Sequence, residues 1–235
     1  MQGLQEGFAE CGLGEVGMIY SVGMKKNKFD VAPDHGRTAF YVDEHHDGEN
    51  IDNLNSQYNE ITGLYYLWKN VHNVPYKGLE HYRRAIWDRT GTHLLEPDEI
   101  KAILENYDVI LTDNYVFFGG TMNRYCMPVD SKIGHIEKMN RFNNGFGDFY
   151  KRYMKTHYPS EFSWTNMFIG REDIVDEYCA MLFNLCSHIE APSDSKRFFG
   201  YCCEKLWSPW AAFNGMMVYH GRVHIYADKP SDAGY

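Results

Sequence analysis

The feature that most constrains this fold is the alternation of short apolar segments with amphipathic ones. Met18 to Val22 and Thr38 to Val42 have the length and composition of buried strands. The segment 54–71 instead repeats large apolar residues at helical spacing, so that they share one face of a helix. Those residues are Leu54, Tyr58, Ile61, Tyr65 and Trp68. Strands that alternate with such helices favour a layered α/β fold with a mainly parallel sheet.

The same alternation continues to the end of the chain. We expect further strands at 81–87, 107–111, 165–169 and 222–226. We expect helices at 97–106, 171–189 and 199–214, and an interrupted helical pattern at 130–155. A chain of 235 residues suits one domain, so we treat 1–235 as a single domain with 1–16 as a loose N-terminal arm. Ligands of α/β sheets bind at the carboxyl ends of strands, which directs attention to the polar residues that follow each strand.

Charge and composition disfavour several classes of partner. The formal net charge is −9, which argues against broad binding to nucleic acid or anionic lipid. The six cysteines show no C-x-x-C spacing, which favours reduced thiols in a reducing compartment. The first residues are polar and no long apolar run occurs, so we expect no signal peptide, no membrane span and a cytoplasmic protein. Aromatic residues are abundant, at 16%, and their flat faces suit stacking on sugars and bases.

Four blocks of sequence carry a resemblance to a known family. They are NIDNLNSQYNEITGLYYLWKN at 50–70, YKGLEHYRR at 76–84, WTNMFIGREDIVDEYCAMLF at 164–183 and RFFGYCCEKLWSPW at 197–210. In order and composition they resemble the motifs of a bacterial capsular and exopolysaccharide glycosyltransferase family, long labelled a domain of unknown function. The chain departs from that pattern at its first strand, which lacks a histidine–lysine dipeptide, and in residues 112–135.

The resemblance implies a fold, a reaction and its partners. The fold would be a GT-A-like three-layer domain that binds a nucleotide sugar. The reaction would transfer a hexose, such as galactose or galactofuranose, from a UDP-linked donor. The acceptor would be a growing glycan or a lipid-linked oligosaccharide, which implies peripheral contact with the cytoplasmic face of a membrane.

The sequence His-Tyr-Arg-Arg at 81–84 is the candidate for binding the donor diphosphate. Many GT-A enzymes end a strand here in Asp-x-Asp, which holds a metal ion, and this chain contains no Asp-x-Asp. Arginine forms bidentate, charge-assisted bonds to phosphate. We therefore expect His81, Arg83 and Arg84 to neutralise the leaving diphosphate as cations, with no required cofactor and without favouring Mn²⁺ or Mg²⁺. The alternative is a strand edge with solvated arginines.

Two glutamates are candidates for the base that removes the proton of the acceptor hydroxyl. Glu204, within the expected helix 199–214, is the first candidate, and Glu60 stands off the apolar face of the helix 54–71. Arg197 precedes Glu204 by seven residues, where it can bind phosphate or form a structural pair with Glu204. Pairing would lower the pKa of Glu204, whereas partial burial would raise it.

The acidic turn at 43–53 is a further candidate for the donor site. Asp43 and Asp47 enclose two histidines and can hold a divalent cation or a ribose, and the alternative is a solvated turn. Asn55 and Tyr58 follow at the start of the expected helix and are included among the donor-binding residues.

The acceptor candidates are Trp164, Asn166 and Met167, in a region that touches the acceptor in the transferases that the chain resembles. Trp164 can stack under a pyranose ring and Asn166 can bind a sugar hydroxyl, whereas the alternative is a core tryptophan and a turn asparagine. Two other functions stay open. A non-catalytic carbohydrate-binding module would use the aromatic residues without His81, Arg83 or Glu204. A metal-dependent nucleotide-sugar hydrolase would use the acidic turn.

Overall fold

The computed structural model describes residues 16–25, 35–113, 139–141, 144–157, 163, 165–191 and 196–226. Its strands are β1 (Met18–Gly23), β2 (Arg37–Tyr41), β3 (Tyr76–His81), β4 (Arg84–Trp87), β5 (Val109–Thr112), β6 (Phe168–Arg171) and β7 (Val218–Ile225). The strand order is β2-β1-β3-β4-β7-β5-β6, and β3 also pairs with β6. The strands β3 to β7 therefore close into a ring, from which β1 and β2 extend.

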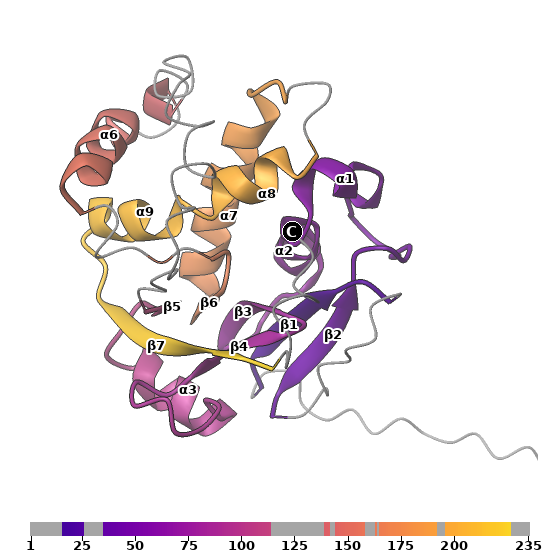
Figure 1. The fold of residues 1–235 in the computed structure, drawn as a ribbon, viewed down its shortest axis with the longest axis vertical. Coiled ribbons are helices and arrows are strands. Elements are labelled where there is room, and N and C mark those ends of the chain that lie inside the picture. Colours follow the sequence, from indigo (N-terminus) through magenta and orange to yellow (C-terminus); the bar gives the residue numbers. More distant parts are fainter. Residues whose placement is uncertain are drawn as a thin grey trace, which may run out of the picture.

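Helices cover both sides of this sheet. They are the short 3₁₀ helix η1 (Asp52–Leu54) and the α-helices α1 (Asn55–Tyr58), α2 (Ile61–Asn70), α3 (Pro97–Leu104), α6 (Phe146–His157), α7 (Glu172–Ser187), α8 (Phe198–Cys203) and α9 (Trp207–Phe213). Figure 1 shows α1, α2, α7, α8 and α9 on one side of the sheet and α3 on the other. The start of α3 is fixed by a capping box between Glu96 and Glu99, with Pro97 at the first helical position.

Alternate residues of the strands face two apolar cores. In β1, Tyr20 and Val22 belong to the core that lies under α2 and α7. Ile19 points the other way, into the core that includes Ile100 and Leu104 of α3. This period of two is what a strand buried on both faces requires, and it explains why the strand segments are apolar throughout.

The sheet is mixed, which corrects the expectation of a mainly parallel sheet. β1 is parallel to β2 and β3, and β5 is parallel to β7. β6 is antiparallel to β3 and β5, and β4 is antiparallel to β3 and β7. For β4 the reason is local. The single strand expected at 81–87 is two strands joined by a turn at Tyr82 and Arg83, and so short a connection forces the two strands to run antiparallel.

Two of the expected helices are interrupted. The helix expected at 54–71 divides at Asn59, whose φ of 55° and ψ of −129° lie outside the helical region. The helix expected at 199–214 divides between Cys203, the last residue of α8, and the start of α9. Tyr58 and Ile61 are buried on either side of the first break, so the apolar periodicity continues through it and conceals it.

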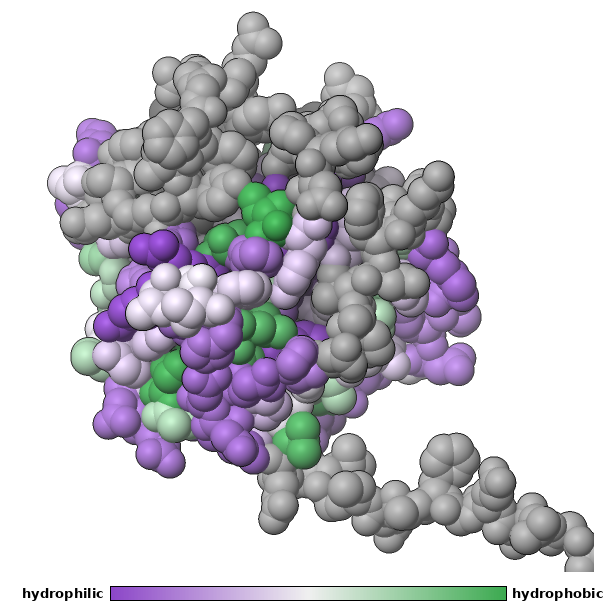
Figure 2. Space-filling model, turned by 60° about the horizontal axis from the view of Figure 1, so that its bottom comes forward, coloured by the Kyte–Doolittle hydropathy of each residue, from purple (hydrophilic) through white to green (hydrophobic). Residues whose placement is uncertain are grey.

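The described surface is largely hydrophilic on the face shown in Figure 2, where hydrophobic residues form only small patches. Within the described ranges, no helix has both the length and the apolar character needed to cross a membrane.

Candidate active site

A pocket of about 240 Å³ opens where β1 and β3 end, beside the break between α1 and α2 and the start of α8. Gly23 from the end of β1 and His81 from the end of β3 are among its lining residues. The carboxyl ends of parallel strands are where α/β sheets bind ligands. The charged and amide side chains that line the pocket come from Asn59, Glu60, His81, Arg83, Arg84, Arg197 and Glu204. All of these except Asn59 are candidates that the sequence analysis named, drawn from three separate segments.

Glu60 is held by a network that joins three elements. Its carboxyl is buried, with the residue 8% exposed, and its Oε1 accepts a hydrogen bond of 2.6 Å from Nδ2 of Asn166. The same Nδ2 donates to the carbonyl oxygen of Gly200 in α8, at 3.1 Å. The side chain of Asn59 donates to the other carboxyl oxygen of Glu60. Asn166 therefore positions Glu60 and α8 relative to one another.

Glu204 lies at the C-cap of α8 and faces the same pocket. Burial raises the pKa of its carboxyl well above the ordinary value, and the nearby charge of Glu60 raises the pKa further. Arg84, Lys205 and Arg197 act in the opposite direction and lower this pKa. The two carboxyl groups thus share one pocket, and their mutual repulsion is only partly offset by the basic residues.

His81 is the last residue of β3, and its Nε2 is buried without a hydrogen-bond partner. Burial lowers the pKa of the imidazole to about 4, the positive charges of Arg84 and Arg83 lower it too, and Glu60 partly counteracts them. His81 is therefore neutral at pH 7, which corrects its expected role as a cation. A neutral imidazole with an unpartnered nitrogen can still donate or accept one hydrogen bond to a ligand.

Three arginines supply the positive charge of the pocket. Arg83 lies in the turn between β3 and β4, Arg84 begins β4, and Arg197 precedes α8. Arg197 has a left-handed backbone conformation with φ of 59°, and its N–H donates to the carbonyl oxygen of Ser56 at 2.8 Å. This bond ties the entry of α8 to α1, and Arg197 lines the pocket beside it.

The remaining donor candidates lie away from the pocket. Tyr58 is 9% exposed and stacks on Phe199 in the helical core, with ring centroids 4.5 Å apart. Asn55 accepts a hydrogen bond from Thr62 at 3.4 Å within the helix pair. In the acidic turn, Asp43 accepts the backbone N–H of Lys25 at 2.7 Å. Asp47 is exposed in the same turn. None of these four residues lines the pocket.

The acceptor candidates are distributed differently from the expectation. Asn166 is 2% exposed and holds Glu60, as described above, while Met167 is fully buried in the core against α3. Neither side chain offers surface to an acceptor. Trp164 lies outside the described residues. Asn59 and Tyr201 also line the pocket and were not predicted. The one local signal for Asn59 is its residue type, because asparagine tolerates the positive φ that interrupts the helix before Glu60.

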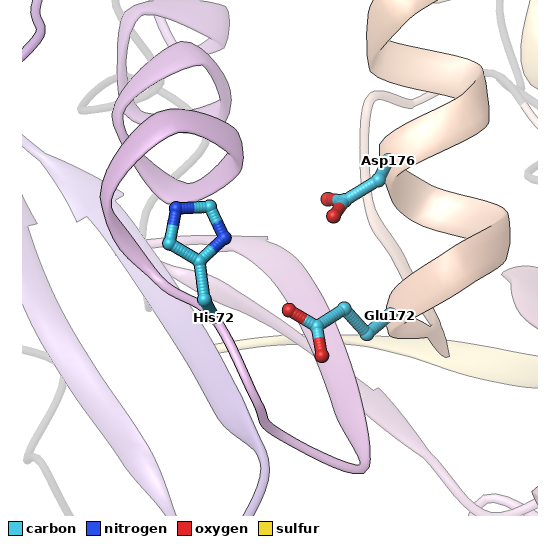
Figure 3. A group of neighbouring side chains, drawn as sticks. All are labelled: His72, Glu172 and Asp176. Atoms are coloured by element: carbon cyan, nitrogen blue, oxygen red, sulfur yellow. The ribbon is translucent and has the colours of Figure 1, made fainter.

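A second group of possible ligands lies at the opposite end of β3. Side-chain atoms of His72, Glu172 and Asp176 lie within 4.8 Å of one another, and Figure 3 shows the two carboxylates of α7 facing the imidazole. The ammonium of the fully buried Lys77 lies 2.6 Å from Asp176 and 3.2 Å from Glu172. Both oxygens of Glu172 also accept backbone N–H groups from the loop before β3. The ammonium of Lys77 already pairs with both carboxylates, so we assign this group to the stability of the fold rather than to a metal.

Comparisons with known proteins agree with this architecture. The family described as domain of unknown function DUF4422 matches residues 20–215. The apo structure of the bifunctional glycosyltransferase WbbM superposes with a TM-score of 0.69 at 19% sequence identity. The match covers 91% of this chain and 46% of that chain, so this chain spans less than half of that protein's length, and at this identity the likeness concerns the fold. No curated protein sequence matches the chain. Because the family match covers most of the sequence, the chain belongs to the DUF4422 family.

Proposed function

We propose that this protein is a glycosyltransferase that moves a hexose from a UDP-linked donor, such as UDP-galactose or UDP-galactofuranose, to a growing capsular or exopolysaccharide glycan in the cytoplasm. One observation carries the proposal. A single pocket at the carboxyl ends of β1 and β3 combines three arginines with two carboxyl groups. The three arginines suit the binding of a diphosphate, and the two carboxyl groups suit the binding and deprotonation of an acceptor hydroxyl. The likeness in fold to a glycosyltransferase structure supports this reading.

The arginines would bind the diphosphate of the donor. Arg83 and Arg84 approach from the β3–β4 turn and Arg197 from the start of α8, so a diphosphate between them would be contacted from two sides. Guanidinium groups form bidentate, charge-assisted bonds with phosphate and stay charged at any working pH. His81, being neutral, would add one hydrogen bond through its buried Nε2. These arginines and His81 would stabilise the leaving diphosphate through their side chains, so that no metal ion is required.

The carboxyl groups would then act on the acceptor. The acceptor hydroxyl oxygen attacks the anomeric carbon, the bond from that carbon to the diphosphate oxygen breaks, and the electron pair leaves with UDP. The hydroxyl proton passes to the carboxylate of Glu204. Burial raises the pKa of this carboxyl, which makes its carboxylate a stronger base. Glu60 accepts hydrogen bonds from Asn59 and Asn166, which suits it better to orienting a sugar than to taking a proton.

Calorimetric titration of UDP and UDP-hexoses tests the donor site. We expect UDP to bind the wild type in EDTA, and Arg83→Ala and Arg197→Ala each to weaken binding by about tenfold or more, since each loses a charge-assisted contact of at least about 1.5 kcal/mol. Arg152→Ala, on the exposed face of α6, is the matched control and should bind as wild type. Loss of UDP binding in EDTA with recovery in Mn²⁺ would refute the metal-independent clamp. Absence of binding to every nucleotide would refute the donor site and favour a carbohydrate-binding module.

A further inference from the structure

The acceptor needs a surface next to the pocket, and the buried side chains of Asn166 and Met167 do not supply one. The strands β4 and β7 offer another. They pair antiparallel from Arg84 and Ile225 at one end to Trp87 and Arg222 at the other. In Figure 1, β7 is the long yellow strand beside β4.

Three aromatic side chains form a strip on this strand pair, which we name the β4–β7 strip: Trp87, His224 and Tyr226. The rings of Trp87 and His224 are stacked, with centroids 3.9 Å apart and planes 16° apart. The ring of Tyr226 meets His224 edge-on at 4.8 Å, and Nε1 of Trp87 donates to the Tyr226 hydroxyl at 3.4 Å. Tyr226 is 41% exposed. Trp87 and His224 are partly buried, so the strip is a preformed aromatic group whose most exposed ring is that of Tyr226.

The strip is continuous with the pocket. The backbone N–H of Tyr226 donates to the carbonyl oxygen of Arg83 at 2.9 Å, and Arg84 is paired with Ile225. Both arginines line the pocket. The backbone of Tyr226 lies beside Arg83, so the strip adjoins the pocket at this residue, and its three rings form one compact group.

We propose that the β4–β7 strip binds the glycan chain of the acceptor and directs its terminal hydroxyl into the pocket. This inference rests on the function proposed above for the pocket. Aromatic faces cover the apolar faces of sugar rings, while polar edges bind their hydroxyls. Alternate residues of a strand share a face, so His220 and Arg222 lie on the same face of β7 as His224 and supply hydrogen-bonding groups there. A lipid or a protein partner would favour a broader apolar patch than three rings interspersed with polar groups.

The experiment measures oligosaccharide binding and UDP binding separately. Ligand-observed NMR titrations would use galacto-oligosaccharides and malto-oligosaccharides of increasing length on wild type, Trp87→Ala and Tyr226→Ala. UDP binding would be measured on the same proteins by calorimetry. Tyr65→Ala is the matched control, because Tyr65 is a partly exposed aromatic residue on α2, remote from the strip in sequence and in the fold.

We expect wild-type affinity to increase with oligosaccharide length. Each strip variant should raise the oligosaccharide Kd by about tenfold, as the loss of one stacking contact of about 1.4 kcal/mol implies, with UDP affinity unchanged. Tyr226→Ala keeps the test valid if Trp87→Ala fails to fold. Oligosaccharide binding that is absent in the wild type, or equal in the wild type and both variants, overturns the inference while leaving the donor site intact. Strip-dependent oligosaccharide binding without UDP binding would instead overturn the transferase and retain the strip as a glycan site.

Discussion

The contact that most clearly organises the candidate active site is the side-chain amide of Asn166, and its removal has a calculable cost. Asn166→Ala deletes a 2.6 Å hydrogen bond to the carboxyl of Glu60 and a 3.1 Å bond to the carbonyl of Gly200. A hydrogen bond to a charged group contributes about 1.5–3 kcal/mol and one to a neutral carbonyl about 0.5–1.5 kcal/mol. Because both acceptors are buried and lose their donor, we expect the free energy of unfolding to fall by about 2–4 kcal/mol.

Urea denaturation followed by circular dichroism measures this loss, with an unchanged m-value showing that the unfolded state is comparable. Asn214→Ala is the matched control. Its amide also donates to a backbone carbonyl, that of Trp210 at 2.8 Å, but the residue is exposed, so we expect a change under about 0.5 kcal/mol. A double-mutant cycle with Glu60→Gln isolates the charged bond, and its coupling energy should reach about 1.5 kcal/mol. A loss below about 1 kcal/mol in Asn166→Ala would refute the view that this amide holds the site together.

Three further predictions follow from the same geometry. The pKa of His81 is lowered to about 4, so the unfolded chain binds more protons than the folded chain as the pH falls below 6.5. Wild type should therefore lose about 3 kcal/mol of stability between pH 7 and pH 4 through this residue. In urea titrations, His81→Gln should show a correspondingly flatter dependence of stability on pH. The raised pKa of Glu204 affects stability in the opposite direction, because protonation of this carboxyl favours the folded state. Glu204→Gln should be more stable than wild type at pH 8, should lose that advantage as the pH falls toward 4.5, and should have no transfer activity. Equal melting temperatures at pH 8 would contradict the burial of an ionised group. In α2, a Cβ on Gly63 would lie 2.9 Å from Val22 and 3.1 Å from Phe40, so Gly63→Ala should lower stability by about 1–2 kcal/mol despite the better helix propensity of alanine, as thermal unfolding would show.

The sequence predicted most of the elements because strand and helix periodicities are local properties. β1, β2, α3, β5 and α7 lie within a few residues of their expected positions. The directions of the strands were not predictable in the same way. The turn at Tyr82 and Arg83 contains none of the residues that usually mark a turn, so nothing local revealed that β4 reverses the chain. The direction of β6 depends on its pairing with β3 and β5, which are distant in sequence.

In the candidate site, too, the residue types were predictable and the contacts made by the fold were not. Arg83, Arg84 and Arg197 were predictable as candidates, because guanidinium groups suit phosphate and these residues lie in blocks that carry the family resemblance, whereas their meeting in one pocket depends on the fold. The charge of His81 was not predictable, because its pKa is lowered chiefly by burial, which depends on the whole fold. Asn166 was predicted to bind the acceptor, because nothing in its local sequence indicates that Glu60, more than a hundred residues away, is its partner.

Both carboxyl groups of the site lie at interruptions of helices, and this position explains how they share a pocket. A side chain inside a continuous helix keeps the direction that the helix gives it. Asn59 leaves the helical conformation just before Glu60, and α8 ends just before Glu204. The direction of neither acid is therefore set by the face that a continuous helix would give it. Gly200 in α8 lies close to the first break, and a Cβ there would lie 3.3 Å from the Cβ of Asn59, so a larger residue would require a small shift. The interruptions of the two helices therefore bring two acids to one pocket, and the bonds of Asn166 hold Glu60 against α8.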